Sequence, residues 1–209
     1  GSDTTGYRVV FGESDGIPGL IVDRYENVLV MQLATAGIEQ LRPLVIEALL
    51  RAFRPDCLID RSDIATRQEE GMSPRVEIVH GADPGEVEFT EYGTWYIAEP
   101  HSGQKTGFFL DQKDLRREIG HIAAGRTILN LFSYTGSNGV AVLKGGAQSI
   151  RHIDSSESAL ATCATQLELN ELDSSHMDLE CADVFQWLDG HPDERFDMVI
   201  MDPPALIKS

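Results

Sequence analysis

Near the middle of the chain the sequence reads Ile128-Leu129-Asn130-Leu131-Phe132-Ser133-Tyr134-Thr135-Gly136-Ser137-Asn138-Gly139. It runs from an apolar strand through a turn of small residues into a helix. Glycine in such a turn lets a ligand approach the backbone closely, and the start of the helix offers free N–H groups to a carboxylate. We expect the turn to hold part of a cofactor, although many α/β proteins use a similar turn only to reverse the chain.

After Pro100 the sequence alternates between strands and helices. The expected elements are strands at 127–131, 149–154, 177–181 and 197–201, with helices at 138–144 and 156–170. This alternation is typical of parallel βαβ units. It predicts a Rossmann-like α/β sheet in a domain that covers residues 100–209.

Before residue 100 the pattern is one of short strands separated by turns. The expected elements are strands at 7–11, 20–24, 28–33, 57–60, 76–79, 87–89 and 94–97, and a helix at 39–53. Tyr92-Gly93 is typical of a tight hairpin turn. The sequence therefore predicts a small α+β domain over residues 3–99.

Acidic residues follow the second and third strands of the predicted Rossmann-like sheet. Asp154 comes about 20 residues after the glycine turn, where an acid in such a sheet accepts both hydroxyls of a ribose. Asp183 follows the third strand, where it could meet the amino group of an adenine while Val184 packs on the ring. Each aspartate also fits a simpler role as the cap of the next helix.

The fourth strand ends in Asp202-Pro203-Pro204. Ligands bind beyond the carboxyl ends of the strands in open α/β sheets. The two prolines restrict the backbone and remove N–H donors, so they favour a rigid loop in which Asp202 and carbonyl groups face a planar, amine-bearing base. We interpret Asp202, Pro203 and Pro204 as a catalytic loop.

Composition limits the partners that the chain can take. It has 34 acidic against 17 basic residues, a formal net charge of −17, which counts against nucleic acid as a partner. Cys57, Cys163 and Cys181 form no metal-binding spacing, so we expect no metal site and three reduced, buried thiols. No apolar run approaches the roughly 20 residues that span a bilayer, so we expect a cytoplasmic protein without a membrane partner.

Three segments resemble motifs of the ribosomal RNA large-subunit (cytosine-5) methyltransferases, a family of class I S-adenosylmethionine-dependent methyltransferases. The first is Gly-Glu-Ser-Asp-Gly-Ile-Pro-Gly-Leu-Ile-Val-Asp-Arg-Tyr at 12–25, and the second is Asp-Arg-Ser-Asp at 60–63. The third, Gly-Gln-Lys-Thr-Gly-Phe-Phe-Leu-Asp-Gln at 103–112, resembles the linker that closes over the cofactor in that family. The resemblance implies a class I methyltransferase fold, S-adenosyl-L-methionine as cofactor and ribosomal RNA as substrate.

The resemblance also implies the residues of the site. The residues expected at the cofactor are Lys105, Thr106, Phe109, Asn130, Phe132, Ser133, Tyr134, Thr135, Gly136, Asp154, Ser155, Asp183, Val184 and Asp202. Asp202, with Pro203 and Pro204, would line the pocket that receives a cytosine flipped out of its stack.

Methylation of carbon-5 requires a cysteine thiolate that adds to carbon-6 of the base. None of the three cysteines has the expected setting of a reactive thiolate. The resemblance implies that the nucleophile lies in a later strand-loop motif, beyond Ser209. A class I sheet has seven strands and this chain supplies four, so we expect a C-terminally truncated sheet that binds cofactor weakly and is inactive alone. A homodimer would cover the exposed edge.

Two other functions fit the same residues. A methyltransferase that acts on a small molecule or on a nitrogen atom would suit the acidic charge and would need no cysteine. A non-catalytic module would bind S-adenosylmethionine without transferring its methyl group.

Overall fold

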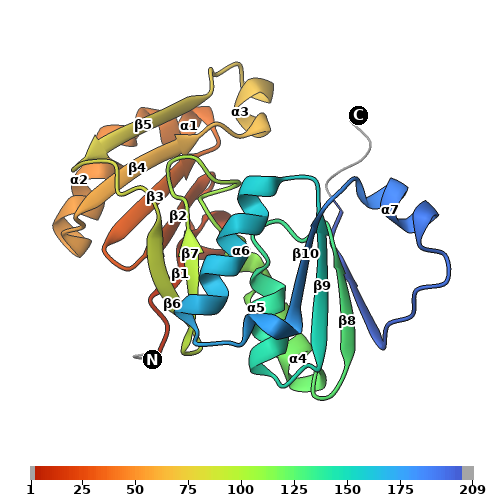
Figure 1. Cartoon of the computed structure of the whole chain (residues 1–209). Coiled ribbons are helices and arrows are strands. Elements are labelled where there is room, and N and C mark those ends of the chain that lie inside the picture. Colours follow the sequence, from red (N-terminus) through yellow and green to blue (C-terminus); the bar gives the residue numbers. More distant parts are fainter. Residues whose placement is uncertain (1–2, 204–209) are drawn as a thin grey trace. The chain divides into compact units, whose positions relative to one another are not determined.

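The computed structural model describes residues 3–203 of the chain. The chain divides into two compact units, Gly1–Asp111 and Gln112–Ser209 (Figure 1). Segment 100–111 therefore belongs with the first unit, whereas the sequence pattern changes near residue 100. No helix within residues 3–203 is long and apolar enough to cross a membrane.

The first unit contains a five-stranded sheet and a two-stranded hairpin. The sheet has the order β1-β2-β3-β4-β5, in which only β3 and β4 are parallel. The strands are β1 (Gly6–Phe11), β2 (Leu20–Tyr25), β3 (Val28–Leu33), β4 (Cys57–Ser62), β5 (Arg75–His80), β6 (Val87–Glu91) and β7 (Thr94–Ala98). Tyr92 and Gly93 both have positive φ at the β6–β7 turn, as the sequence predicts for a hairpin of this kind.

The helix predicted at 39–53 is divided in two. Helix α1 (Ala36–Gln40) and helix α2 (Arg42–Phe53) meet at Leu41. Pro43 lies in the first turn of α2, where its missing N–H costs nothing, but the same proline inside one continuous helix would remove a hydrogen bond and clash with the preceding turn. The prediction of a single helix was therefore wrong. The unit also contains α3 (Ala65–Glu69) and the 3-10 turn η1 (Gly12–Asp15).

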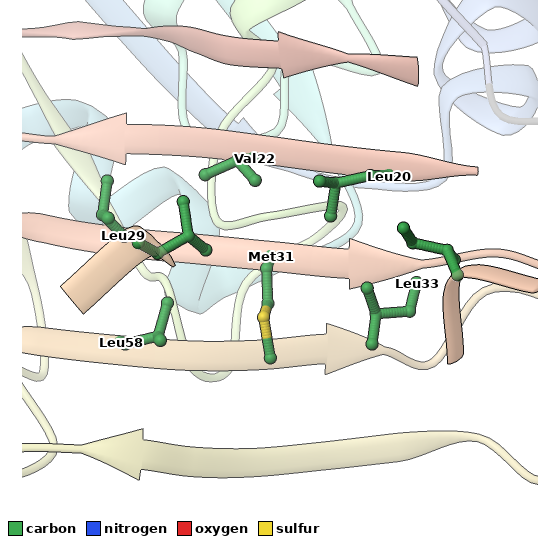
Figure 2. Packing of buried hydrophobic residues seen from close by; sticks show 8 residues of the cluster. Leu20, Val22, Leu29, Met31, Leu33 and Leu58 are labelled. Atoms are coloured by element: carbon green, nitrogen blue, oxygen red, sulfur yellow. The ribbon is translucent and has the colours of Figure 1, made fainter. Parts of the chain in front are cut away.

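One face of the five-stranded sheet carries the main apolar core of the first unit. Figure 2 shows the side chains of neighbouring strands β2, β3 and β4 gathered there: Leu20, Val22, Leu29, Met31, Leu33 and Leu58. Ile38 of α1 and Leu49 of α2 complete the cluster, so both helices cover this face. Alternate residues of the strands form an apolar surface on this face of the sheet. The apolar stripe of the helical segment packs against that surface.

The second unit is built on a four-stranded parallel sheet with the order β10-β9-β8-β11. Its strands are β8 (Thr127–Leu131), β9 (Ser149–Asp154), β10 (Met177–Cys181) and β11 (Met198–Met201). Its helices are α4 (Lys113–Ile122), α5 (Ser137–Lys144), α6 (Glu157–Leu169) and α7 (Val184–Gly190), with the 3-10 turn η3 (Ser174–His176) before β10. The 3-10 turn η2 (Leu110–Gln112) ends at the first residue of this unit. The predicted Rossmann-like sheet is confirmed.

Helices cover both faces of this sheet. Ile119 of α4 and Val142 of α5 pack with Ile128, Ile150 and Ile200 on one face. Val184 and Trp187 of α7 pack with Leu129, Leu131 and Ile153 on the other face.

The strand order also fixes where a ligand can bind. The chain passes from β8 to β9 and β10 in one direction, and then returns to β11 on the opposite side of β8. Such a reversal leaves a crevice beyond the carboxyl ends of the strands, where open α/β sheets bind ligands. In the second unit this edge is where the turn after β8 and the three aspartates lie.

Candidate functional site

The turn after β8 has an unusual backbone. Phe132, Tyr134 and Gly136 have φ of 55°, 48° and 72°, in the left-handed region that side chains other than glycine seldom adopt. Two hydrogen bonds hold this conformation: the Tyr134 N–H donates to Asp154 Oδ2 over 2.7 Å, and the Gly136 N–H donates to the Ser133 carbonyl over 2.9 Å. Strained backbone of this kind persists where the surroundings over-determine it, and it is concentrated at functional sites.

Packing against α6 requires a glycine at position 136. A Cβ on Gly136 would lie 2.1 Å from Cys163 Sγ on α6. Gln166, also on α6 and fully buried, donates from Nε2 to the Thr135 carbonyl over 2.5 Å. The turn is thus seated directly on α6, and the role of Gly136 at a cofactor stays a prediction.

Two buried polar atoms near this turn have no hydrogen-bond partner among the described residues. They are Ser133 Oγ, in the turn, and Asn138 Oδ1, in the first turn of α5. An unsatisfied buried polar atom is costly, and each case in a native structure calls for a missing partner such as a water or a ligand. The residues of the turn therefore fit a polar ligand such as the amino acid portion of S-adenosylmethionine.

Asp183 caps the next helix, as its simpler interpretation predicts, whereas Asp154 does not, because the N-cap of α6 is Ser156. Asp154 Oδ1 accepts from the Ser156 N–H over 2.9 Å, and Asp183 accepts from the Gln186 N–H over 2.9 Å as the N-cap of α7. An ionised carboxylate has about four lone-pair positions, so one or two backbone bonds leave acceptor capacity for ligand hydroxyl or amino groups. Ser155, the remaining predicted residue here, is exposed between Asp154 and the N-cap of α6.

The predicted apolar residues lie in different settings. Val184 is buried with Trp187 in the cluster under α7. Phe132 contacts the ring of Phe185 edge-on, with centroids 5.8 Å apart, and Phe185 is 52% exposed. Phe185 was not predicted as a site residue, although an aromatic two positions after an expected adenine ligand was a usable signal.

Asn130 lies inside the sheet, below the turn. Its Nδ2 is 3.2 Å from Nδ1 of the fully buried His152, whose Nε2 is 3.8 Å from Cys163 Sγ. Burial lowers the pKa of His152 to about 4 and raises the pKa of the Cys163 thiol to about 12. All three groups are therefore neutral near pH 7 and support the turn from the interior.

The Asp-Pro-Pro loop follows β11 at the same edge of the sheet. Asp202 and Pro203 are exposed, and Pro204 lies outside the described residues. Nε2 of Gln112, the residue before α4, donates a hydrogen bond to Asp202 Oδ2. The sequence did not predict this contact, because the two residues are 90 positions apart.

The other predicted cofactor residues, Lys105, Thr106 and Phe109, belong to the first unit. Lys105 Nζ lies 2.8 Å from each carboxylate oxygen of Asp111 and 4.3 Å from the centre of the Phe109 ring. Thr106 is buried, and its hydroxyl donates to Asp23 over 2.6 Å. The role of these residues at a cofactor stays a prediction.

The cysteines are not all buried. Cys57 and Cys163 are buried and have raised thiol pKa values, because burial disfavours the thiolate. Cys181, at the end of β10, is exposed, so the expectation of three core cysteines was wrong for this residue. Its Sγ lies 3.6 Å from the Ser155 carbonyl.

Residues 74–209 match a family described as S-adenosylmethionine-dependent methyltransferase. A relative from Serratia proteamaculans, named ribosomal RNA large subunit methyltransferase I, is 42% identical over 208 residues, which are 98% of this chain and 52% of the relative. The chain thus spans about half the length of the curated relatives it matches.

Solved structures of similar fold are also named as methyltransferases. A putative methyltransferase complexed with SAH is 27% identical, with a TM-score of 0.88 over 100% of this chain and 54% of its own. A putative SAM-dependent methyltransferase from Streptococcus mutans is 27% identical, with a TM-score of 0.85 over 98% of this chain and 53% of its own. From its sequence and its fold, the chain belongs to the S-adenosylmethionine-dependent methyltransferases.

Proposed function

We propose that the second unit binds S-adenosylmethionine at the carboxyl ends of its parallel strands, and that the protein methylates carbon-5 of a cytosine in 23S ribosomal RNA. The observation that carries the cofactor site is the hydrogen bond from Tyr134 N–H to Asp154, beside the buried and unpartnered hydroxyl of Ser133. This hydrogen bond holds the turn after β8 beside the acid that ends β9. S-adenosylmethionine is a nucleoside linked to an amino acid, so its two parts need binding groups that lie side by side in this way.

Each part of the proposed site has a defined task. The turn 132–136 holds the methionine end, with Ser133 and Asn138 as polar partners. The remaining acceptor positions of Asp154 bind the ribose hydroxyls, and Asp183 accepts from the adenine amino group. Phe132 and Phe185 add an aromatic edge to the same region. The placement of the residues and the family of the chain support these assignments.

The proposed substrate follows from the relatives. Relatives that are 42% identical to this chain over about half of their own length are named ribosomal RNA large subunit methyltransferase I, and the motifs at 12–25, 60–63 and 103–112 support the same group. Asp202, exposed at the end of β11 and followed by a proline, is the side chain that we assign to the target base. A charge of −17 implies that the base and its local fold, more than phosphate contacts, determine recognition by this part of the protein.

The chemistry of carbon-5 methylation sets one further requirement. Bound S-adenosylmethionine supplies an electrophilic methyl group. Addition of a thiolate to carbon-6 of cytosine makes carbon-5 nucleophilic; carbon-5 then gains the methyl group, loses its proton, and the thiolate leaves. Cys57 and Cys163 are excluded as that thiolate by burial and by their raised pKa values.

The proposal is tested with 23S ribosomal RNA that carries tritium on carbon-5 of cytosine. Incubation with S-adenosylmethionine and a protein that carries this chain at the full length of its relatives should release one tritium for each methyl group gained by the RNA. Methyl transfer without tritium release would show methylation of a nitrogen or oxygen and would overturn the carbon-5 assignment.

Cofactor binding is measured separately, by titration calorimetry without RNA. Binding of S-adenosylmethionine with no transfer to RNA would overturn the proposed substrate and leave the cofactor site intact. Absence of binding would overturn the site itself. Ser133→Ala is the informative variant, and Ser158→Ala, on the exposed side of α6, is its matched control.

A further inference from the structure

We infer that Gln112 is a positioning residue that holds the carboxylate of Asp202 in the orientation needed for methyl transfer. This inference rests on the proposed function, in which Asp202 faces the target base. It is carried by one side-chain contact within the second unit: Gln112 Nε2 donates a hydrogen bond to Asp202 Oδ2.

Asp202 needs an external partner because its own backbone fixes only part of its geometry. Pro203 follows it, and a residue before proline is confined to extended conformations. This restriction orients the Cα–Cβ bond of Asp202 but leaves the side-chain torsions free. Asp202 is exposed, so packing does not select a rotamer either. The amide of Gln112 supplies the missing constraint by engaging one carboxylate oxygen, Oδ2.

Both ends of this contact belong to the same compact unit. Gln112 immediately precedes α4, and Ile119 of α4 packs with Ile200 of β11, two residues before Asp202. Side chains positioned by a packed helix and a packed strand keep their relative geometry better than side chains on two loops. The contact is therefore suited to hold Asp202 before the substrate arrives.

An amide donor has a chemical advantage at this position. A lysine or arginine would neutralise Asp202 and compete with the amino group of the base. Gln112 donates a hydrogen bond without adding charge, so the carboxylate keeps its negative charge and its capacity to accept from the base. The contact orients Asp202 at little cost to its affinity for an amine.

The test compares Gln112→Leu, Gln112→Glu and Asp202→Asn in the complete methyl-transfer reaction. Gln112→Leu removes a hydrogen bond to a charged group, and loss of this bond during methyl transfer should lower kcat by about tenfold. Gln112→Glu, which places a second carboxylate beside Asp202, should lower kcat further. The Kd for S-adenosylmethionine and the midpoint of urea unfolding should change little in Gln112→Leu, which separates positioning from folding.

Three comparisons decide the inference. Adding Gln112→Leu to Asp202→Asn should cause no further loss of kcat, because the partner of Gln112 is already altered. Gln112→Lys, which restores a donor but adds a charge that neutralises Asp202, should not recover the loss. Gln148→Leu is the control, since Gln148 is an exposed glutamine at the opposite, amino-terminal edge of the sheet. A kcat for Gln112→Leu equal to that of the unaltered protein, while Asp202→Asn is impaired, would overturn the inference and leave the proposed function standing.

A nuclear magnetic resonance experiment distinguishes the two proposals without turnover. The side-chain amide signals of Gln112, assigned by their loss in Gln112→Leu, should shift in Asp202→Asn. Unchanged signals would show that the two side chains are not coupled and would overturn the inference. An unaltered protein that shows this coupling but methylates no RNA would overturn the proposed function alone.

Discussion

The backbone N–H of Tyr134 and the carboxylate of Asp154 are joined by a 2.7 Å hydrogen bond between the turn after β8 and the end of β9. The other oxygen of Asp154 accepts from the N–H of Ser156. One side chain thus fixes the left-handed conformation of the turn and the start of α6. The same carboxylate faces the edge of the sheet to which we assign the cofactor.

Asp154→Asn should weaken S-adenosylmethionine binding by about tenfold or more, since hydrogen bonds to a charged acceptor contribute about 1.5–3 kcal/mol each. An amide has one oxygen, so it cannot accept from both Tyr134 and Ser156, and its NH₂ group would face one of these donors. Titration calorimetry measures the change. Asp178→Asn, an exposed aspartate on β10, is the control and should leave the Kd within about twofold. Equal affinities for both variants would exclude Asp154 from the site.

The parallel sheet was predictable because its strands are short apolar runs with clear ends. Strands β8, β9 and β10 have the predicted bounds, each closed by a turn or by an acid. Helices α4 and α7 were not predicted. Leu115, Ile119 and Ile122 of α4 recur at helical spacing, so this helix was overlooked rather than unmarked. Helix α7 is seven residues long, too short for a distinctive apolar periodicity.

The site was predictable only as far as local sequence determines it. The positions of Asp154, Asp183 and Asp202 follow from strand ends, which the sequence marks. The contacts of Gly136 with Cys163 and of Gln112 with Asp202 join residues far apart in the chain, and a single sequence holds no local trace of them. The division of the predicted helix at Leu41 is different, because Pro43 marked it and its effect on a continuous helix was overlooked.

Gly136→Ala should destabilise the protein by more than its backbone strain alone. The positive φ costs about 1–2 kcal/mol for a residue with a Cβ, and overpacking against Cys163 adds about 1–3 kcal/mol. Gly125→Ala is a matched control, since Gly125 has φ 71° and open space where its Cβ would lie. Urea unfolding of both variants separates the two costs. Adding Cys163→Ala should restore part of the loss in Gly136→Ala, and a lack of any recovery would show that the clash is not with the sulfur.

His152 should make the protein less stable at acid pH. Its pKa falls from 6.5 to about 4 in the folded protein because burial disfavours the charged ring. Between these values the unfolded chain binds a proton that the folded chain does not. The contribution of His152 is therefore complete above pH 6.5 and is lost as the pH falls toward 4, by at most about 1.4 kcal/mol per pH unit.

The measurement for His152 is the free energy of unfolding at pH 7 and pH 5 in the unaltered protein and in His152→Gln. Carboxylates also titrate in acid. The difference in pH dependence of the unfolding free energy between the two proteins therefore isolates the contribution of the histidine. Its pH dependence should be weaker in His152→Gln. Identical pH dependence would mean that the folded protein accommodates the charged ring. His121, an exposed histidine of α4, provides the control variant His121→Gln.

Arg61→Leu should loosen the segment that contains Lys105. The guanidinium of Arg61 is buried and donates to the carbonyls of Pro100 and Gly103 over 3.0 and 2.9 Å, and to both oxygens of Asp63. Leucine would leave these acceptors without their donor, at a cost of about 2–3 kcal/mol. Hydrogen exchange should accelerate at the amide of Gly103, which donates to the Glu99 carbonyl within the same segment.

Arg61→Lys separates charge from geometry in this contact. A lysine keeps the positive charge but lacks the planar fork that reaches two carbonyls and a carboxylate together, so it should recover less than half of the lost stability. Arg51→Leu, on the exposed side of α2, is the control and should change stability by about 0.5 kcal/mol or less. Full recovery in Arg61→Lys would show that charge alone holds the segment, whereas unchanged exchange at Gly103 in Arg61→Leu would show that Arg61 does not anchor it. In the second case, the role of the Asp-Arg-Ser-Asp motif at 60–63 would not be explained by its contact with the segment at 100–107.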